Sequence, residues 1–175
     1  VEVSGKHREK VRVGQEGDTL VLESIGRVQD REITVSYPKK TEFEEASVDV
    51  VAGTVNLDDN FYAKKLEVSV AAGEFTNDST ITAEKAELTV GTGNIDLENL
   101  KVQNLEADCG IGNIDLGIDG KEKDYDYEIS CAAGAIDIGD SSFSGLGHEK
   151  KISNPGSSGK MTFDCGVGNI TVDFE

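Results

Sequence analysis

Residues 86–97, which read AELTVGTGNIDL, hold the pattern that decides the fold of this chain. Two short runs of alternating apolar and polar residues flank a glycine corner, which is typical of two half-buried β-strands joined by a turn. The pattern occurs five more times, and its corner glycines are spaced by 20, 20, 19, 22 and 34 residues. These glycines are Gly53, Gly73, Gly93, Gly112, Gly134 and Gly168. A period near 20 residues with two strands per repeat predicts a β-solenoid, in which each repeat is one rung.

Aligned on these glycines, the repeats form columns of like residues. Three residues before each glycine the column holds Val50, Val70, Val90, Cys109, Cys131 and Cys165. Two residues after each glycine it holds Val55, Phe75, Ile95, Ile114, Ile136 and Ile170. The positions between these columns are polar, so each strand has one buried and one solvated face. The sequence therefore predicts an all-β solenoid of about six rungs, each of roughly 20 residues, with stacked apolar columns as its core.

We expect one structural domain with two regions. Residues 1–42 alternate irregularly and predict β-strands that cap the solenoid, with a turn at residues 15–18. Residues 43–175 hold the repeats. The segment at residues 139–159 is rich in serine and glycine, and the repeat does not account for it. It predicts an inserted loop.

The paired glycines and Asn77 each predict a local feature of the repeats. Paired glycines such as Gly91 and Gly93 predict corners that need a positive φ angle. Asn77 stands in a column that is otherwise aliphatic. A buried amide must find a hydrogen-bond partner or mark an opened rung, and we expect a local break there.

The balance of charge narrows the range of partners. The chain has 175 residues, 34 of them acidic and 17 basic, which gives a formal net charge of -17. Such a chain repels phosphate backbones and anionic membranes, so nucleic acid is not expected as a partner. No apolar run has the roughly 18–20 residues of a membrane span. The chain begins at Val1, and we expect any membrane anchor or signal segment to lie upstream of it.

The repeats, preceded by ITVSYP at residues 33–38 and ended by DCGVGNI at residues 164–170, resemble a bacterial family of adhesin-like domains of unknown function. They are also similar to the head domains of autotransporter adhesins. The resemblance covers the chain from Thr19 to its end. It implies an all-β, β-helix-like fold on extracytoplasmic bacterial proteins, often behind a membrane anchor, and it implies no catalytic residue.

The three cysteines, Cys109, Cys131 and Cys165, share one apolar column and form no Cys-x-x-Cys pair. This argues against a disulfide framework and a structural zinc site, and it favours buried core residues. Aligned in chain order, Cys109 and Cys131 fall on consecutive rungs. Such neighbours come within the Cα separation of a disulfide, about 4.4–6.8 Å, so a disulfide and metal ligation by thiolates stay open.

Three outward aspartates, Asp96, Asp115 and Asp137, would stack as a carboxylate ladder. Like charges at strand spacing repel unless they are solvated or recruit cations, which makes these residues the calcium candidates. The Gly-Gly-x-Gly-x-Asp nonapeptide of calcium-binding β-rolls is absent. We therefore assign no metal and no other cofactor.

The sequence does not favour an enzyme. Glycan-active β-helices need paired acids in a cleft, commonly with aromatic platforms, and this chain has no tryptophan. Its two histidines, His7 and His148, fall in the irregular N-terminal region and in the inserted segment. No nucleophile elbow, zinc-protease helix or phosphate loop is present.

We expect a non-enzymatic surface module of a bacterial protein, either an adhesin-like domain with a protein or glycan ligand or a spacer. The binding candidates are residues of the inserted segment: Phe143, Leu146, His148 and Lys150. A homo-oligomer through a solenoid end is the alternative, because residues 172–175 are expected to form an open edge guarded by Asp173 and Glu175. A glycan-active enzyme is the second alternative.

Overall fold

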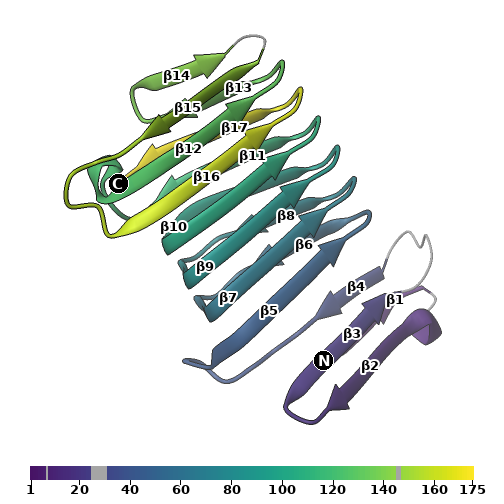
Figure 1. Ribbon diagram of the computed structural model, residues 1–175. Helices are drawn as coiled ribbons and strands as arrows, with labels where there is room; N and C mark the ends of the chain where they lie inside the picture. The colour runs from purple at the N-terminus through teal and green to yellow at the C-terminus, as the bar shows by residue number, and fades with distance from the viewer. Residues whose placement is uncertain (7, 25–30, 145–146) are drawn as a thin grey trace. The chain divides into compact units, whose positions relative to one another are not determined.

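The computed structural model describes residues 1–6, 8–24, 31–144 and 147–175, which form seventeen β-strands and two short 3₁₀ helices (Figure 1). Their contacts divide the chain into two compact units, residues 1–39 and residues 40–175. The predicted all-β solenoid fold is confirmed, and residues 40–175 form it. Neither described helix is long and apolar enough to cross a membrane.

The first unit consists of two antiparallel strand pairs. They are β1 (Glu2–Gly5) with β4 (Arg31–Thr34), and β2 (Val11–Glu16) with β3 (Thr19–Ser24); the 3₁₀ helix η1 (Arg8–Lys10) precedes β2. The β2–β3 hairpin lies where the sequence predicts strands around a turn, and Gly17 supplies its positive φ of 62°. None of the residues of this unit whose burial the structure describes is fully buried. The prediction that this region caps the solenoid stays a prediction.

In the second unit each rung has a long strand, a corner and a short strand. The long strands are β5 (Glu42–Val50), β7 (Phe61–Val70), β9 (Ile81–Val90), β12 (Tyr125–Cys131) and β16 (Gly159–Cys165). The short strands are β6 (Thr54–Leu57), β8 (Glu74–Asn77), β11 (Asn113–Ile118), β13 (Ala135–Ile138) and β17 (Asn169–Phe174). Strand β10 (Asn94–Cys109) supplies the short strand of one rung and the long strand of the next. The 3₁₀ helix η2 (Glu122–Asp124) leads into β12.

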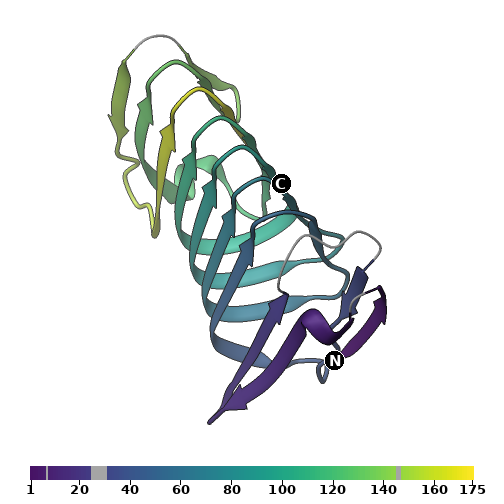
Figure 2. The ribbon, with the colours of Figure 1, turned by 90° about the vertical axis from the view of Figure 1, so that its right-hand side faces the viewer.

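The rungs do not stack in chain order. Strand β16 lies between β10 and β12 and pairs in parallel with both. Likewise β17 lies between β11 and β13. Figures 1 and 2 show this last rung, in yellow, among teal and green strands that precede it in the chain. The rung of β16 and β17, which comes last in the chain, therefore lies beside the fourth rung. The rung of β12 and β13, which comes before it in the chain, lies beyond it in the stack.

The inserted segment forms two β-strands where the sequence predicts a loop. It forms β14 (Ser141–Ser144), antiparallel to β13, and β15 (His148–Ile152), antiparallel to β12. These two strands form one end of the solenoid. The expectation of an open edge at residues 172–175 holds only in part. Strand β17 lies inside the stack and pairs with β11 over Asn169–Phe174, but it pairs with β13 only over Asn169–Val172. The outer edges at this end of the solenoid belong to β14 and β15.

The apolar columns form the core as predicted. Phe75, Ile95, Ile114, Ile136 and Ile170 are all 0% exposed, and in-register parallel pairing stacks them. Ile81 and Leu100 are also buried, and they pair in register within the long strands. Each complete rung therefore has two strands.

The corner glycines are needed for a different reason from the expected one. Of the six, all of which the structure describes, only Gly53 has a positive φ, 116°. At Gly112, a Cβ atom would lie 1.9 Å from the carbonyl oxygen of Gly93 on the neighbouring rung. Close approach between backbones therefore selects glycine at five of the corners, whereas a positive φ selects it at Gly53, where an added Cβ would meet no atom within 4 Å.

Asn77 does not open its rung. Its side chain is 2% exposed, donates to the carbonyl of Ser79 and accepts from the backbone N–H of Glu98 at 2.9 Å. The expected local break is wrong, because the buried amide is hydrogen-bonded on both sides. The bulge in this part of the solenoid lies between Leu97 and Leu100, where the pairing of β10 with β11 shifts register.

Candidate functional site

The outward face of the long strands carries rows of charged side chains from neighbouring rungs. Lys65 on β7 lies 3.2 Å from Glu67, 3.5 Å from Glu45 and 3.7 Å from Glu87. Lys85 on β9 also pairs with Glu87. These side chains are largely solvated, so each pair contributes little to stability. Their effect is to hold the carboxylates of three neighbouring strands close together.

A second ion-pair group joins the inserted segment to the last rung. Glu128 on β12 accepts from Lys151 on β15 and from Lys160 on β16, both at 2.8 Å. These hydrogen bonds lower the pKa of Glu128 to about 2. The group therefore bridges three strands that are far apart in the chain.

Glu128→Gln is expected to reduce the acid sensitivity of the fold. The unfolded pKa of glutamate is about 4.3, whereas the folded pKa of Glu128 is about 2. A lowered pKa stabilises the fold above the unfolded value, and this contribution is lost as pH falls from about 4.3 to about 2. The Tm of the variant should fall less over that window, as measured by circular dichroism. Glu98→Gln, at an exposed carboxylate with no ion pair among the described residues, is the control. Equal acid sensitivity of Glu128→Gln and the parent would contradict the assignment.

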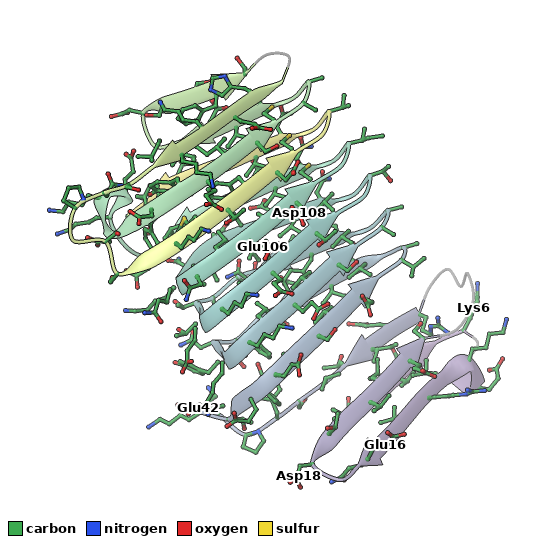
Figure 3. The ribbon with its side chains drawn as sticks, in the orientation of Figure 1. Lys6, Glu16, Asp18, Glu42, Glu106 and Asp108 are labelled. Carbon is green, nitrogen blue, oxygen red and sulfur yellow. The ribbon has the colours of Figure 1, made fainter. Side chains whose placement is uncertain are left out.

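An acidic hollow lies farther along the same face. It has a volume of about 160 Å³ and is lined by Glu87, Leu88, Thr89, Glu106 and Asp108. Figure 3 marks Glu106 and Asp108 on β10. Burial, and then the charges of Glu106 and Asp164, raise the pKa of Asp108. Within the part of the chain that the structure describes, Glu106, Asp108 and Asp164 have no ion pair with a basic side chain.

Beside these carboxylates runs an uncharged edge of the solenoid, which we call the corner ridge. It consists of the two residues before each corner glycine. In stacking order these are Val51 and Ala52, Ala71 and Ala72, Gly91 and Thr92, Gly110 and Ile111, Gly166 and Val167, and Ala132 and Ala133. The ridge is not among the sites predicted from the sequence, although neither of its two columns holds a charged residue in the aligned repeats.

The binding candidates of the inserted segment form a cluster at the end of the solenoid. Phe143 is 6% exposed and continues the core column opposite Ile136. Its ring centroid lies 5.9 Å from that of His148, and the Nζ atom of Lys150 lies 4.9 Å from the Phe143 centroid. Leu146 lies outside the described residues. The structure thus brings three candidates together around a buried ring, and their binding of a ligand stays a prediction.

His148 has an unpartnered nitrogen. Its Nε2 atom is buried and has no hydrogen-bond partner among the described residues, although the residue as a whole is only half-buried. It lies in register with Cys131, at the end of the cysteine column.

The cysteine column has a different order from the expected one, since Cys165 lies between Cys109 and Cys131. All three are buried free thiols. The Sγ atoms of Cys109 and Cys165 donate to the carbonyl oxygens of Gly112 and Gly168, each at 3.0 Å. Burial raises the pKa of Cys165 to about 12 and also raises that of Cys109. The cysteines act as core residues at the corners.

We expect no cysteine of the native protein to react rapidly with a disulfide reagent at pH 8. The thiolate is the reactive form, and burial disfavours it at Cys109 and Cys165. Titration in denaturant without reductant should give three thiols. Fast modification of the native chain, or fewer than three thiols after unfolding, would contradict this role.

The calcium candidates do not form one continuous ladder. Asp96 and Asp115 are neighbours in register, but Thr171 on β17 separates Asp115 from Asp137. Among the described residues, no group of three or more histidine, cysteine or acidic side chains is arranged to hold a metal ion. The interposed rung is the reason that the expected ladder is interrupted.

A comparison with protein families gave one match. The family model described as Toastrack DUF4097, a domain of unknown function, matches residues 1–147. The matched region ends just before β15, so the interposed rung of β16 and β17 lies outside it. Neither a search of curated proteins nor a search of solved structures gave a match.

Proposed function

We propose, from the premise that this chain belongs to the Toastrack DUF4097 family, that it is a non-enzymatic binding module of an extracytoplasmic bacterial surface protein. The observation that carries the proposal is the form of the surface. The acidic hollow of about 160 Å³ is smaller than the roughly 300–1,000 Å³ of typical small-molecule pockets. The outward faces are instead broad rows of side chains. Such a surface suits a macromolecular ligand better than a small substrate.

The largest pKa shifts among the described residues also support a non-enzymatic role. Glu128 is perturbed by its lysine partners across the strands. The raised pKa values of Tyr127 and Cys165 follow chiefly from burial in the core. The Tyr127 hydroxyl donates a hydrogen bond to the Glu122 carbonyl at 2.6 Å. Structural ion pairs and burial account for these shifts without catalysis.

The proposal is tested by incubating the fluorescently labelled chain with intact bacterial cells and, in parallel, with acidic polysaccharides. We expect saturable binding to cells and no release of reducing sugar. Sugar release would overturn the non-enzymatic assignment and favour a glycan-active enzyme. Absence of saturable binding would overturn the binding role and leave a spacer.

Self-association through a solenoid end is the second candidate function. The outer edges of β14 and β15 lack a strand partner among the described residues, and an open edge is a template for pairing with another chain. Lys150 and Lys151 on β15 work against such pairing, because charged side chains blunt an edge. Sedimentation velocity over a concentration series discriminates, since a strict monomer removes this candidate.

A further inference from the structure

The corner ridge is a continuous surface, because backbone hydrogen bonds connect its rungs. The amides of Thr92, Ile111, Val167 and Ala133 each donate to the corner of the preceding rung, all at 2.8 Å. None of its twelve residues is charged, in a chain of which 29% of the residues are charged. The ridge is therefore a neutral strip on a strongly acidic protein.

This ridge also exposes large apolar side chains. Val51, Ile111 and Val167 are 74%, 65% and 63% exposed, which makes them the three most exposed large hydrophobic residues of the described chain. Ile111 and Val167 stand on neighbouring rungs, so their side chains are adjacent. Exposed apolar groups that gather on one surface mark interaction sites more often than isolated ones do.

The two sides of the ridge differ in chemistry. On the long-strand side lies the acidic flank, which consists of Glu106, Asp108 and Asp164 and borders the acidic hollow. On the short-strand side, Asn94, Asn113 and Asn169 form an amide ladder with Nδ2 to Oδ1 distances of 3.1 Å. The ridge therefore has carboxylates on one side and neutral amides on the other.

We propose that a protein partner binds along the corner ridge, with an apolar strip over Ile111 and Val167 and lysine or arginine side chains against Glu106, Asp108 and Asp164. This inference rests on the proposed binding function and names the surface and the partner chemistry. Complementary charge selects the partner, because the carboxylates of the acidic flank form no ion pair with the basic side chains that the structure describes. Neither the ridge nor its acidic flank contains a lysine or arginine, so a second copy bound ridge to ridge would supply no cation for these carboxylates, and nucleic acid would bring phosphates.

The direct test uses two synthetic peptides as probes, one of alternating valine and lysine and one of alternating valine and glutamate. Binding is measured by fluorescence anisotropy at about 0.1 M salt, where charges beyond about 10 Å are screened. We expect the lysine peptide to bind and the glutamate peptide not to bind. Equal binding of both, or binding of neither, would overturn the proposal.

Matched variants separate the surface from general attraction to an acidic protein. Ile111→Ser with Val167→Ser, and Asp108→Asn with Asp164→Asn, should each weaken binding by about tenfold or more. Asp96→Asn with Asp115→Asn removes the same charge from the short-strand face and should have little effect. Equal loss in the control would show non-specific attraction, and unchanged binding in the serine variant would exclude the ridge. All of these positions are exposed, and the Tm of each variant verifies its fold.

Two further measurements distinguish the failure of this inference from that of the proposed function. If the parent chain binds cells and the serine variant binds equally well, the ridge assignment fails while the binding function stands. If the parent chain does not bind cells, the binding function itself fails. A dimer of the parent chain that the serine variant abolishes would assign the ridge to a second copy and overturn the proposed partner.

Discussion

Deletion of residues 159–175 is expected to unfold residues 119–158 as well, although those residues stay in the chain. The deletion removes β16 and β17, which occupy the fifth position in the stack. Each of them pairs with a strand of the rung on either side. Strands β12 and β13 then lose their parallel partners, and β14 and β15 are attached only to them. Truncation therefore creates a gap inside the solenoid and not a shorter end.

The deleted strands also supply buried side chains to the core. Met161, Phe163, Ile170 and Val172 are each 0% exposed. Each of these side chains lies in a core column between two neighbouring rungs, so the deletion removes apolar cover from both rungs at once. Closing the gap by a shift of β12 would also break the hydrogen bond of 2.8 Å from the Tyr125 hydroxyl to the Val102 carbonyl.

Hydrogen exchange with mass spectrometry checks this expectation peptide by peptide. We expect residues 125–138 to lose protection in the truncated chain, while β7 and β9 keep more of theirs. Deletion of residues 1–39 is the control, because these residues form a separate compact unit. Protection of residues 125–138 equal to that of the full chain would contradict the interposed arrangement, because rungs stacked in chain order would survive the loss of the last one.

The order of the rungs could not be predicted from the sequence, whereas the rungs themselves could. Period-2 alternation and the corner glycines depend on local sequence, so the columns through Val90 and Ile95 were visible directly. Which rung lies beside which depends on long-range pairing. Cys109, Cys131 and Cys165 occupy equivalent positions in the repeat, so the column pattern alone does not reveal whether Cys131 or Cys165 lies beside Cys109. The 34-residue spacing before Gly168 marked the anomaly without identifying its cause.

The candidate site could likewise be predicted only in part from the sequence. Phe143, His148 and Lys150 were predicted as binding candidates of the inserted segment, and the structure places them side by side. Phe143 lies in the core, which its serine-rich context did not indicate. Their binding of a ligand stays a prediction. The corner ridge could not be predicted from the apolar columns, because its residues lie outside those columns and its large apolar side chains are exposed. Ile111 and Val167 become neighbours only when β16 and β17 take their position beside β10 and β11. The most apolar part of the ridge therefore depends on the interposed position of β16 and β17, which the sequence did not reveal.

Gly168→Ala should be among the most destabilising single substitutions in this chain. A Cβ atom at residue 168 would lie 2.1 Å from the Gly112 carbonyl oxygen and 2.6 Å from the Cys109 Sγ atom. Backbone cannot yield as a flexible side chain does, so rungs four and five would have to separate. Overpacking of a well-packed core costs about 1–3 kcal/mol, and occasionally more. The clash with backbone places this position at the upper end of that range.

The measurement is chemical denaturation followed by circular dichroism, with Gly14→Ala as the matched control. A Cβ at Gly14 meets no atom within 4 Å and its φ is not positive, so the control should change the free energy of unfolding by less than about 0.5 kcal/mol. If residue 168 had to be glycine in order to adopt a positive φ, Gly168→Asn would be less destabilising than Gly168→Ala, because asparagine adopts positive φ more readily than alanine. Close approach predicts the reverse, since asparagine adds further atoms beyond the clashing Cβ. The rank of these two variants therefore distinguishes the two reasons for glycine at the corner.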